Sequence, residues 1–218
     1  MKKIRIWDLP LRAFHWLLVI AVVALVVTSE IGGNAIEWHF KIGYFVLALL
    51  FFRIIWGFVG GYWSRFSHIF YAPSTIVAYL KGQDKPAYHA GHNPLGSLSV
   101  WAILLLLILQ VTSGLFSDDE IAFIGPLAQF VSSTAIQKLT HYHKEIGKTI
   151  LIILIILHVA AIAYYKIKKN NNLITPMLNG DKSLPDDLPA SKDNIYTRML
   201  ALVILGIGLG IAYYVNQL

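Results

Sequence analysis

The chain has 218 residues, of which 56% are hydrophobic and only 14% are charged. Soluble domains carry roughly 25% charged residues, so this composition predicts an integral membrane protein. The complete lack of cysteine excludes disulfides, iron–sulfur clusters, thiolate zinc sites and covalently attached haem. The net charge of +6 is typical of basic loops beside a membrane, and we do not expect nucleic acid as a partner.

Five apolar segments each have about the length that a membrane-spanning helix needs. They cover residues 14–28, 38–60, 98–116, 142–165 and 199–215, and together they predict an all-α fold surrounded by lipid. Arg53 interrupts the second segment, but a long side chain near a helix end can reach the interface. The basic, apolar N-terminus is similar to a signal peptide. No small-residue cleavage site follows it, so we expect a retained helix.

The loops between these segments alternate in charge. Basic residues precede the first segment and follow the second and fourth segments: Lys2, Lys3, Arg5, Arg12, Arg65, Lys81, Lys85, Lys166, Lys168 and Lys169. The other two loops are acidic, with Glu30, Glu37, Asp118, Asp119 and Glu120. Because basic residues flank the cytoplasmic ends of spans, we expect a cytoplasmic N-terminus and a periplasmic C-terminus.

Two histidines, His143 and His158, lie fifteen residues apart in the apolar fourth segment. On an α-helix this spacing puts them about 60° apart around the axis and about 22 Å apart along it. A polar ring within a bilayer is costly and usually functional, so two iron centres at different depths are one interpretation. A pair of histidines hydrogen-bonded to neighbouring helices is the other.

The predicted orientation adds two further histidines to this pattern. His39 begins the second segment on the same side as His143, and His15 begins the first segment on the same side as His158. A six-coordinate haem needs one axial ligand on each face, supplied by facing helices. The matched depths therefore favour two haem sites, with the pairs His15/His158 and His39/His143 as iron ligands.

The remaining histidines carry less weight. His68, His89 and His92 lie in a predicted cytoplasmic loop, where we expect them to be solvated or to cap helices, and His141 should face the interface. No HExxH motif or carboxylate–histidine cluster is present, so we predict no catalytic metal site and no catalytic residues. Three arginines are candidate partners for the propionates of an inner haem: Arg12, Arg53 and Arg65.

Several motifs resemble the bacterial cytochrome b561 and nickel-hydrogenase b-type cytochrome family. They are WDLPLRAFHW, WHFKIGY, FFRIIWGFVGG, SRF, GHNPLGSLSV, QVTSGLF, HKEIG and LHVAAIAYY, and they span residues 4–165. The resemblance implies a four-helix bundle in a bacterial inner membrane, holding two non-covalent b haems on His15, His39, His143 and His158. One departure is the spacing of the fourth-helix histidines, because many members have fourteen residues there and a glutamate in place of Lys144.

The chain then divides into a four-helix diheme domain over residues 1–165, a cytoplasmic connector over 166–198 and an additional membrane helix over 199–218. Between Asn170 and Asn194 the connector is rich in Pro, Asp, Asn and Ser, which predicts irregular structure. Gly206, Gly208 and Gly210 suit close helix contact, within the chain or in a homo-oligomer.

The predicted function is electron transfer across the membrane, between a quinone pool and a redox partner. The acidic Asp118–Glu120 cluster suggests a periplasmic c-type cytochrome as that partner, and a dehydrogenase or hydrogenase is the other option. Whether the chain counts as an enzyme subunit or as a carrier stays open. The alternatives are a membrane anchor of a redox complex with one haem or none, and a small transporter with a histidine proton relay.

Overall fold

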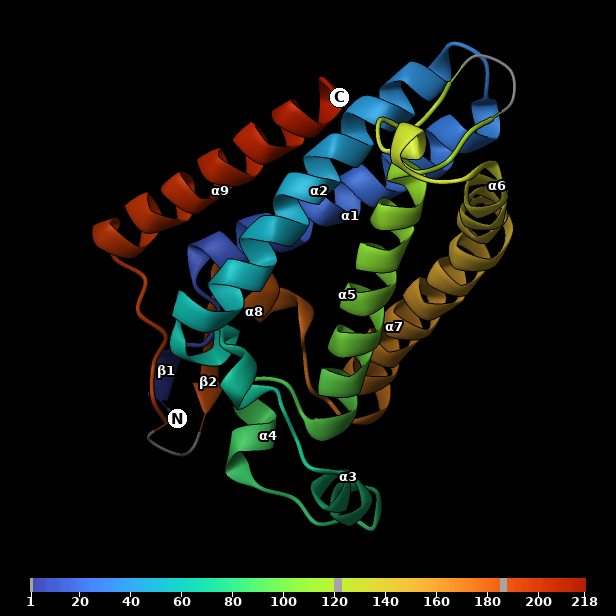
Figure 1. Cartoon of the computed structure of the whole chain (residues 1–218). Helices are drawn as coiled ribbons and strands as arrows, with labels where there is room; N and C mark the ends of the chain where they lie inside the picture. The colour runs from blue at the N-terminus through green and yellow to red at the C-terminus, as the bar shows by residue number, and fades with distance from the viewer. Residues whose placement is uncertain (1, 120–122, 185–187) are drawn as a thin grey trace. The chain divides into compact units, whose positions relative to one another are not determined.

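Five long apolar helices dominate the computed structural model, which describes residues 2–119, 123–184 and 188–218. They are α1 (Leu9–Ile31), α2 (Ala35–Val59), α5 (Pro94–Leu115), α7 (Lys148–Lys168) and α9 (Ile195–Asn216) (Figure 1). Each is long and apolar enough to cross a membrane. The predicted all-α membrane fold is confirmed.

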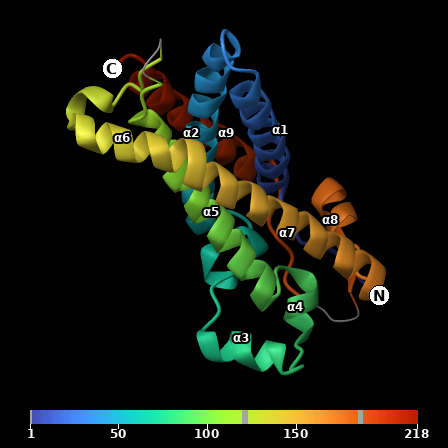
Figure 2. The same cartoon turned by 90° about the vertical axis from the view of Figure 1, so that its right-hand side faces the viewer.

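Shorter elements connect the long helices. They are α3 (Pro73–Leu80), α4 (Pro86–Ala90), α6 (Ser133–His141), α8 (Ile174–Asn179), the 3₁₀ turns η1 (Tyr62–Ser64), η2 (Phe66–His68) and η3 (Ala128–Phe130), and the π-helix η4 (Tyr142–Gly147). Figure 2 shows that α6, η4 and α7 follow one another as a single rod, which covers Ser133–Lys168. The fourth helix is therefore longer at its N-terminal end than hydropathy predicts, because α6 is too polar to register as a span.

Caps define where two of the long helices begin. Asp8 precedes α1, and its Oδ1 accepts a hydrogen bond from the Leu11 backbone N–H at 2.8 Å. Pro10 sits in the first turn, where its missing N–H costs nothing. Asn93 precedes α5 in the same way and accepts from the Gly96 N–H at 2.7 Å. Hydropathy places the start of α1 five residues late because the cap is polar.

The described residues form two compact units, and each long helix contributes a segment to both. The first unit comprises residues 1–15, 53–102 and 156–202, and the second comprises 16–52, 103–155 and 203–218. The sequence predicts three consecutive segments, with boundaries at residues 165 and 198. The boundaries between the two compact units fall instead within the long helices.

The first unit contains the only β-ladder among the described residues. Strand β1 (Lys2–Arg5) pairs antiparallel with β2 (Asp181–Leu184), with Lys2 opposite Leu184 and Arg5 opposite Asp181 (Figure 1). The prediction of an irregular connector is therefore wrong for residues 174–184, which form α8 and β2. The strand is too polar and too short to show alternation, and its stability comes from a partner 176 or more residues away in the chain.

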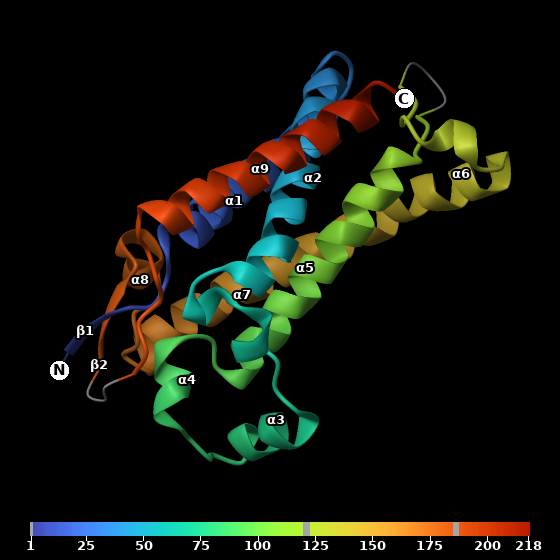
Figure 3. The same ribbon diagram turned by 60° about the vertical axis from the view of Figure 1, so that its left-hand side comes forward.

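In the second unit, α9 packs beside α2 (Figure 3). A Cβ at Gly208 would lie 2.9 Å from the carbonyl oxygen of Ala48, so only glycine permits this approach of the two backbones. Val46, Ala48 and Leu49 of α2 are buried here, as are Ile204 and Ala212 of α9. Close backbone contact of this kind is typical of helices that associate in lipid. The hydrophobic effect does not drive helices together there, so van der Waals packing has to do so.

Candidate haem sites

The structure brings the four candidate histidines together in two pairs, one in each unit. His39 on α2 faces His143 in η4, with 6.1 Å between the ring centroids and 87° between the ring planes. His15 on α1 and His158 on α7 both belong to the first unit. Their predicted role as haem ligands, in the pairs His15/His158 and His39/His143, stays a prediction.

Both rings of the His39–His143 pair are held through Nδ1. His39 Nδ1 lies 3.0 Å from the carbonyl oxygen of Leu25, and His143 Nδ1 lies 2.9 Å from the carbonyl oxygen of Gln110. A carbonyl can only accept, so each Nδ1 carries the proton and donates. Each Nε2 therefore keeps a free lone pair, which is the state that a metal-ligating imidazole needs.

The spacing of this pair fits a haem iron between the two rings. A metal–imidazole bond is about 2 Å long, so an iron with two opposite imidazoles holds their ring centroids roughly 6 Å apart. The 6.1 Å separation agrees with that requirement. Gly114 on α5 adds room beside the site, because a Cβ there would lie 2.8 Å from Cε1 of His143.

The first unit, which contains His15 and His158, also contains an unsatisfied buried donor. Arg53 is 4% exposed, its guanidinium lies 4.6 Å from the centre of the Phe66 ring, and its Nη1 has no hydrogen-bond partner among the described residues. A buried donor of this kind is costly unless an acceptor reaches it. An anionic group within its reach would satisfy it, and haem carries two propionates.

His92 also belongs to this environment, which corrects its predicted solvated or capping role. Its Nδ1 is buried without a partner among the described residues, and its ring lies 4.8 Å from that of Trp7. Burial, together with the charges of Arg53, His158 and His15, lowers the pKa of His92 to about 3. His92 is therefore neutral at physiological pH. The polar sequence of its loop does not predict that its Nδ1 is buried.

The other two arginines are less available. Arg12 donates through Nη1 to the carbonyl oxygen of Leu178 at 2.5 Å, although its Nε is buried without a partner in the described residues. Arg65 donates through Nε to the carbonyl oxygen of Gly60 at 2.9 Å. Arg53 is thus the only one of the three with a buried Nη atom that lacks a hydrogen-bond partner among the described residues.

Two residues that support the sites carry no signal in the sequence. Asp8 is fully buried and accepts hydrogen bonds from the Leu11 N–H, Trp56 Nε1, the Gly61 N–H and the Ser64 hydroxyl. It thereby joins the motifs WDLP, FFRIIWGFVGG and SRF, and its charge interacts with that of Arg53. Gln110 contacts His143 through both its backbone and its side chain. Only the occurrence of these residues within the quoted motifs singles them out.

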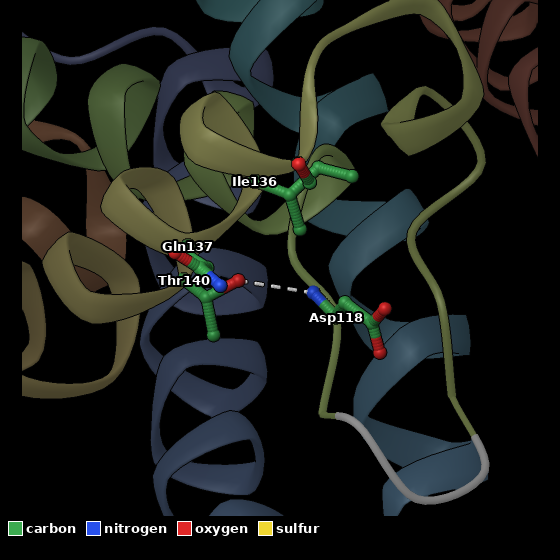
Figure 4. A pocket seen from close by; sticks show the side chains of 5 residues that line it. Asp118, Ile136, Gln137 and Thr140 are labelled. Atoms are coloured by element: carbon green, nitrogen blue, oxygen red, sulfur yellow. Dashed lines mark hydrogen bonds between the residues drawn. The ribbon is translucent and has the colours of Figure 1, made fainter.

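A small cavity of about 210 Å³ lies elsewhere in the second unit, lined by Asp118, Ser133, Ile136, Gln137 and Thr140 (Figure 4). The Asp118 backbone N–H donates to Thr140 Oγ1 across it at 3.0 Å. Among the described residues, no group of three or more His, Asp or Glu side chains is placed to hold a metal ion directly. Glu120 of the predicted acidic cluster lies outside the described residues.

Five helices long and apolar enough to span a membrane, together with the facing rings of His39 and His143, are typical of a multi-pass membrane protein of the b-type cytochrome class. Residues 6–180 match the profile of the family described as "Prokaryotic cytochrome b561", and the chain belongs to that family. Members of the family typically bind b-type haem and transfer electrons.

Curated relatives extend the comparison. The chain is 27% identical over 225 residues to the "Probable Ni/Fe-hydrogenase B-type cytochrome subunit" of Azotobacter chroococcum, covering 84% of this chain and 90% of the relative. It is 24% identical over 213 residues to the "Probable Ni/Fe-hydrogenase 1 B-type cytochrome subunit" of Escherichia coli, covering 82% and 90%. For the corresponding protein of Cupriavidus necator the identity is 23% over 220 residues, covering 85% and 89%. No solved structure matches the chain significantly.

Proposed function

We propose that this chain binds two b haems and carries electrons across the membrane. One haem is held by His39 and His143, and the other by His15 and His158. The observation that carries the proposal is the His39–His143 pair, whose rings stand 6.1 Å apart with both Nδ1 atoms directed at backbone carbonyls. Bound haem iron supplies a one-electron carrier at each pair.

The residues around each pair have distinct roles in this proposal. Leu25 and Gln110 hold the two rings of the His39–His143 pair through their carbonyl groups, which fixes the tautomer. At the His15–His158 site, Arg53 would hold a haem propionate, because its buried Nη1 donor has no other acceptor among the described residues. The negative charge of Asp8 in turn stabilises the positive charge of Arg53.

We further propose that the partner is a Ni/Fe hydrogenase, because the relatives are named as subunits of such enzymes. The family resemblance supports a quinone as the other redox partner. In membranes that contain both proteins, hydrogen gas should then reduce the haems of this chain, and the reduction should disappear without the hydrogenase.

Haem content and single-histidine variants test the two sites. The pyridine haemochrome assay should give two haems per chain for the wild type. His39→Ala and His143→Ala should each remove the same spectral component, and His15→Ala and His158→Ala should each remove the other. His141→Ala is the matched control, because His141 is exposed only two residues from His143 and should leave both haems in place.

Other outcomes would contradict the proposal in defined ways. One haem per chain in the wild type would reject the two-site arrangement and favour the anchor with a single haem. A wild-type protein without haem would leave only the alternative of a membrane anchor for a redox complex. Loss of the same component in His39→Ala and His158→Ala would show that the pairs are assigned wrongly.

A further inference from the structure

Gln110 and His143 are joined at two points. The Nδ1–H of His143 donates to the backbone carbonyl of Gln110 at 2.9 Å, and the side-chain Nε2 of Gln110 donates back to the backbone carbonyl of His143 at 2.8 Å. One residue of α5 thus fixes both the ring and the backbone of the histidine. A hydrogen bond to the ring alone would not fix the backbone of His143, and a shift of that backbone would move the ring.

The backbone of His143 lies in an unusual segment. Residues 142–147 form the π-helix η4, which is wider than the α-helices on either side. Single π-turns within α-helices are rare and occur mostly at functional sites. The wider turn displaces the peptide groups relative to a regular α-helix, and the carbonyl that Gln110 reaches belongs to this turn.

Two glycines leave space for the exchange of hydrogen bonds. A Cβ at Gly147, in the last position of η4, would collide with the Gln110 side chain, and a Cβ at Gly114 would lie 2.8 Å from Cε1 of His143. The Oε1 of Gln110 is buried without a hydrogen-bond partner among the described residues. A buried amide oxygen without a donor is costly, so the favourable Nε2 bond has to offset that cost.

We propose that Gln110 is a positioning residue for His143, and that its side-chain amide holds the π-turn in the conformation that sets the ring plane. The proposal rests on the proposed role of His143 as an iron ligand. Its new content is that the side chain of Gln110, in addition to its backbone carbonyl, determines the orientation of the ligand. No substitution at residue 110 removes the backbone carbonyl, so variants there isolate the contribution of the amide.

The angle between the two rings gives a direct readout. His39 and His143 stand at 87° to each other. Low-spin ferric haem with perpendicular axial imidazoles gives a highly anisotropic electron paramagnetic resonance signal, whereas more nearly parallel rings give an ordinary rhombic one. The signal of this haem therefore reports the orientation of the His143 ring relative to the His39 ring, and an unchanged signal from the other haem would exclude general loosening of the fold.

The experiment compares Gln110→Leu with Thr112→Val in the purified full-length protein with its haems. Leucine keeps the bulk of glutamine but cannot donate to the His143 carbonyl. We expect the anisotropic signal to shift towards the rhombic type and the affinity of this site for haem to fall by roughly 10- to 100-fold, as for other residues that orient a ligand. Thr112→Val, at an exposed position of the same helix, should change neither. The haem at His15/His158 serves as an internal check on folding.

Gly147→Ala provides a second, independent test. Its new methyl group should displace the Gln110 side chain and change the same signal. The new Cβ would also lie 3.0 Å from Cε1 of Tyr142, but its closest contact is with the Gln110 side chain. The double variant with Gln110→Ala should therefore change the signal by less than the sum of the two single changes. A wild-type signal in both Gln110→Leu and Gly147→Ala, with His143→Ala still losing this haem, would overturn the positioning role and leave the ligand assignment intact. Retention of both haems in His143→Ala would instead reject the ligand assignment.

Discussion

At the scale of single residues, the structure depends on a buried carboxylate, whose burial hydropathy analysis does not predict. Asp8 accepts four hydrogen bonds, one of which starts α1, while the other three come from the end of α2 and the turns that follow it. Each donor would otherwise be buried without an acceptor. Asp8 therefore ties the start of the His15 helix to the segment that contains Arg53.

Replacing Asp8 with alanine should destabilise the protein strongly. The change leaves several buried donors and the charge of Arg53 uncompensated, and such losses cost roughly 3–5 kcal/mol. For a chain of this size the thermal unfolding midpoint in detergent should fall by about 10 °C. Asp84→Ala is the control, because the Asp84 side chain is 54% exposed and contacts only His89 and the Lys85 backbone N–H among the described residues, and it should shift the midpoint little. An equal midpoint for Asp8→Ala and the wild type would contradict the role of Asp8.

At the scale of elements, the connector is held to the N-terminal strand by an ion-pair network. Asp193 accepts from Arg5 Nη1 at 2.6 Å, from Arg198 Nε at 2.8 Å and from the Leu9 N–H at 3.2 Å. Asp181 of β2 accepts from Arg5 Nε at 2.5 Å. Arg5 of β1 therefore links β2 to the residue that precedes α9.

This network predicts a loss of local stability in acid. Burial raises the pKa of Asp193, but Arg198, the Leu9 amide and Arg5 together bring it below its ordinary value. A carboxyl whose folded pKa is depressed contributes its stability fully above the unfolded value of about 3.9 and loses it as the pH falls through the folded value. Hydrogen exchange of the β1–β2 amides should therefore become about 10-fold faster when the pH drops below about 4, after correction for intrinsic rates.

Two variants separate this effect from general acid unfolding. Asp193→Asn should already exchange faster at pH 7 and should show a weaker acid dependence. Lys192→Gln changes the exposed neighbouring residue and should behave as the wild type. The network would have no role if Asp193→Asn matched the wild type at both pH values.

The elements also show which structural features the sequence can predict. Long apolar runs identify all five helices, because burial in lipid demands apolar side chains whatever the packing. Depth along those helices predicts that His39 and His143 lie on the same level, and the structure places their ring centroids 6.1 Å apart. The β1–β2 ladder and the π-turn at His143 do not follow, because the first depends on a distant polar partner and the second on a cross-helix contact from Gln110. The polar loop predicts that His92 is solvated or caps a helix, whereas tertiary packing buries its Nδ1.

At the scale of the whole molecule, the charges of the loops favour one direction for the helices through the membrane. We expect five spans to place the two termini on opposite sides. The basic residues lie before α1, between α2 and α5 and after α7, which favours a cytoplasmic N-terminus. In that orientation His39, at the start of α2, lies near the periplasmic side. The haem that it binds would then be the one that exchanges electrons with a periplasmic partner.

The absence of native cysteine makes this orientation directly testable. Asn34, between α1 and α2, and Gln83, between α3 and α4, are both exposed, so each can be replaced by the only thiol in the chain. In a bacterial host whose outer membrane has been made permeable, a maleimide that cannot cross the inner membrane should label Asn34→Cys at once. Gln83→Cys should react only after the inner membrane is opened, because positive-inside orientation keeps its basic loop in the cytoplasm. The reverse pattern would invert the topology and place the His39–His143 pair on the cytoplasmic side. Its electron-transfer partner would then have to be sought on that side too.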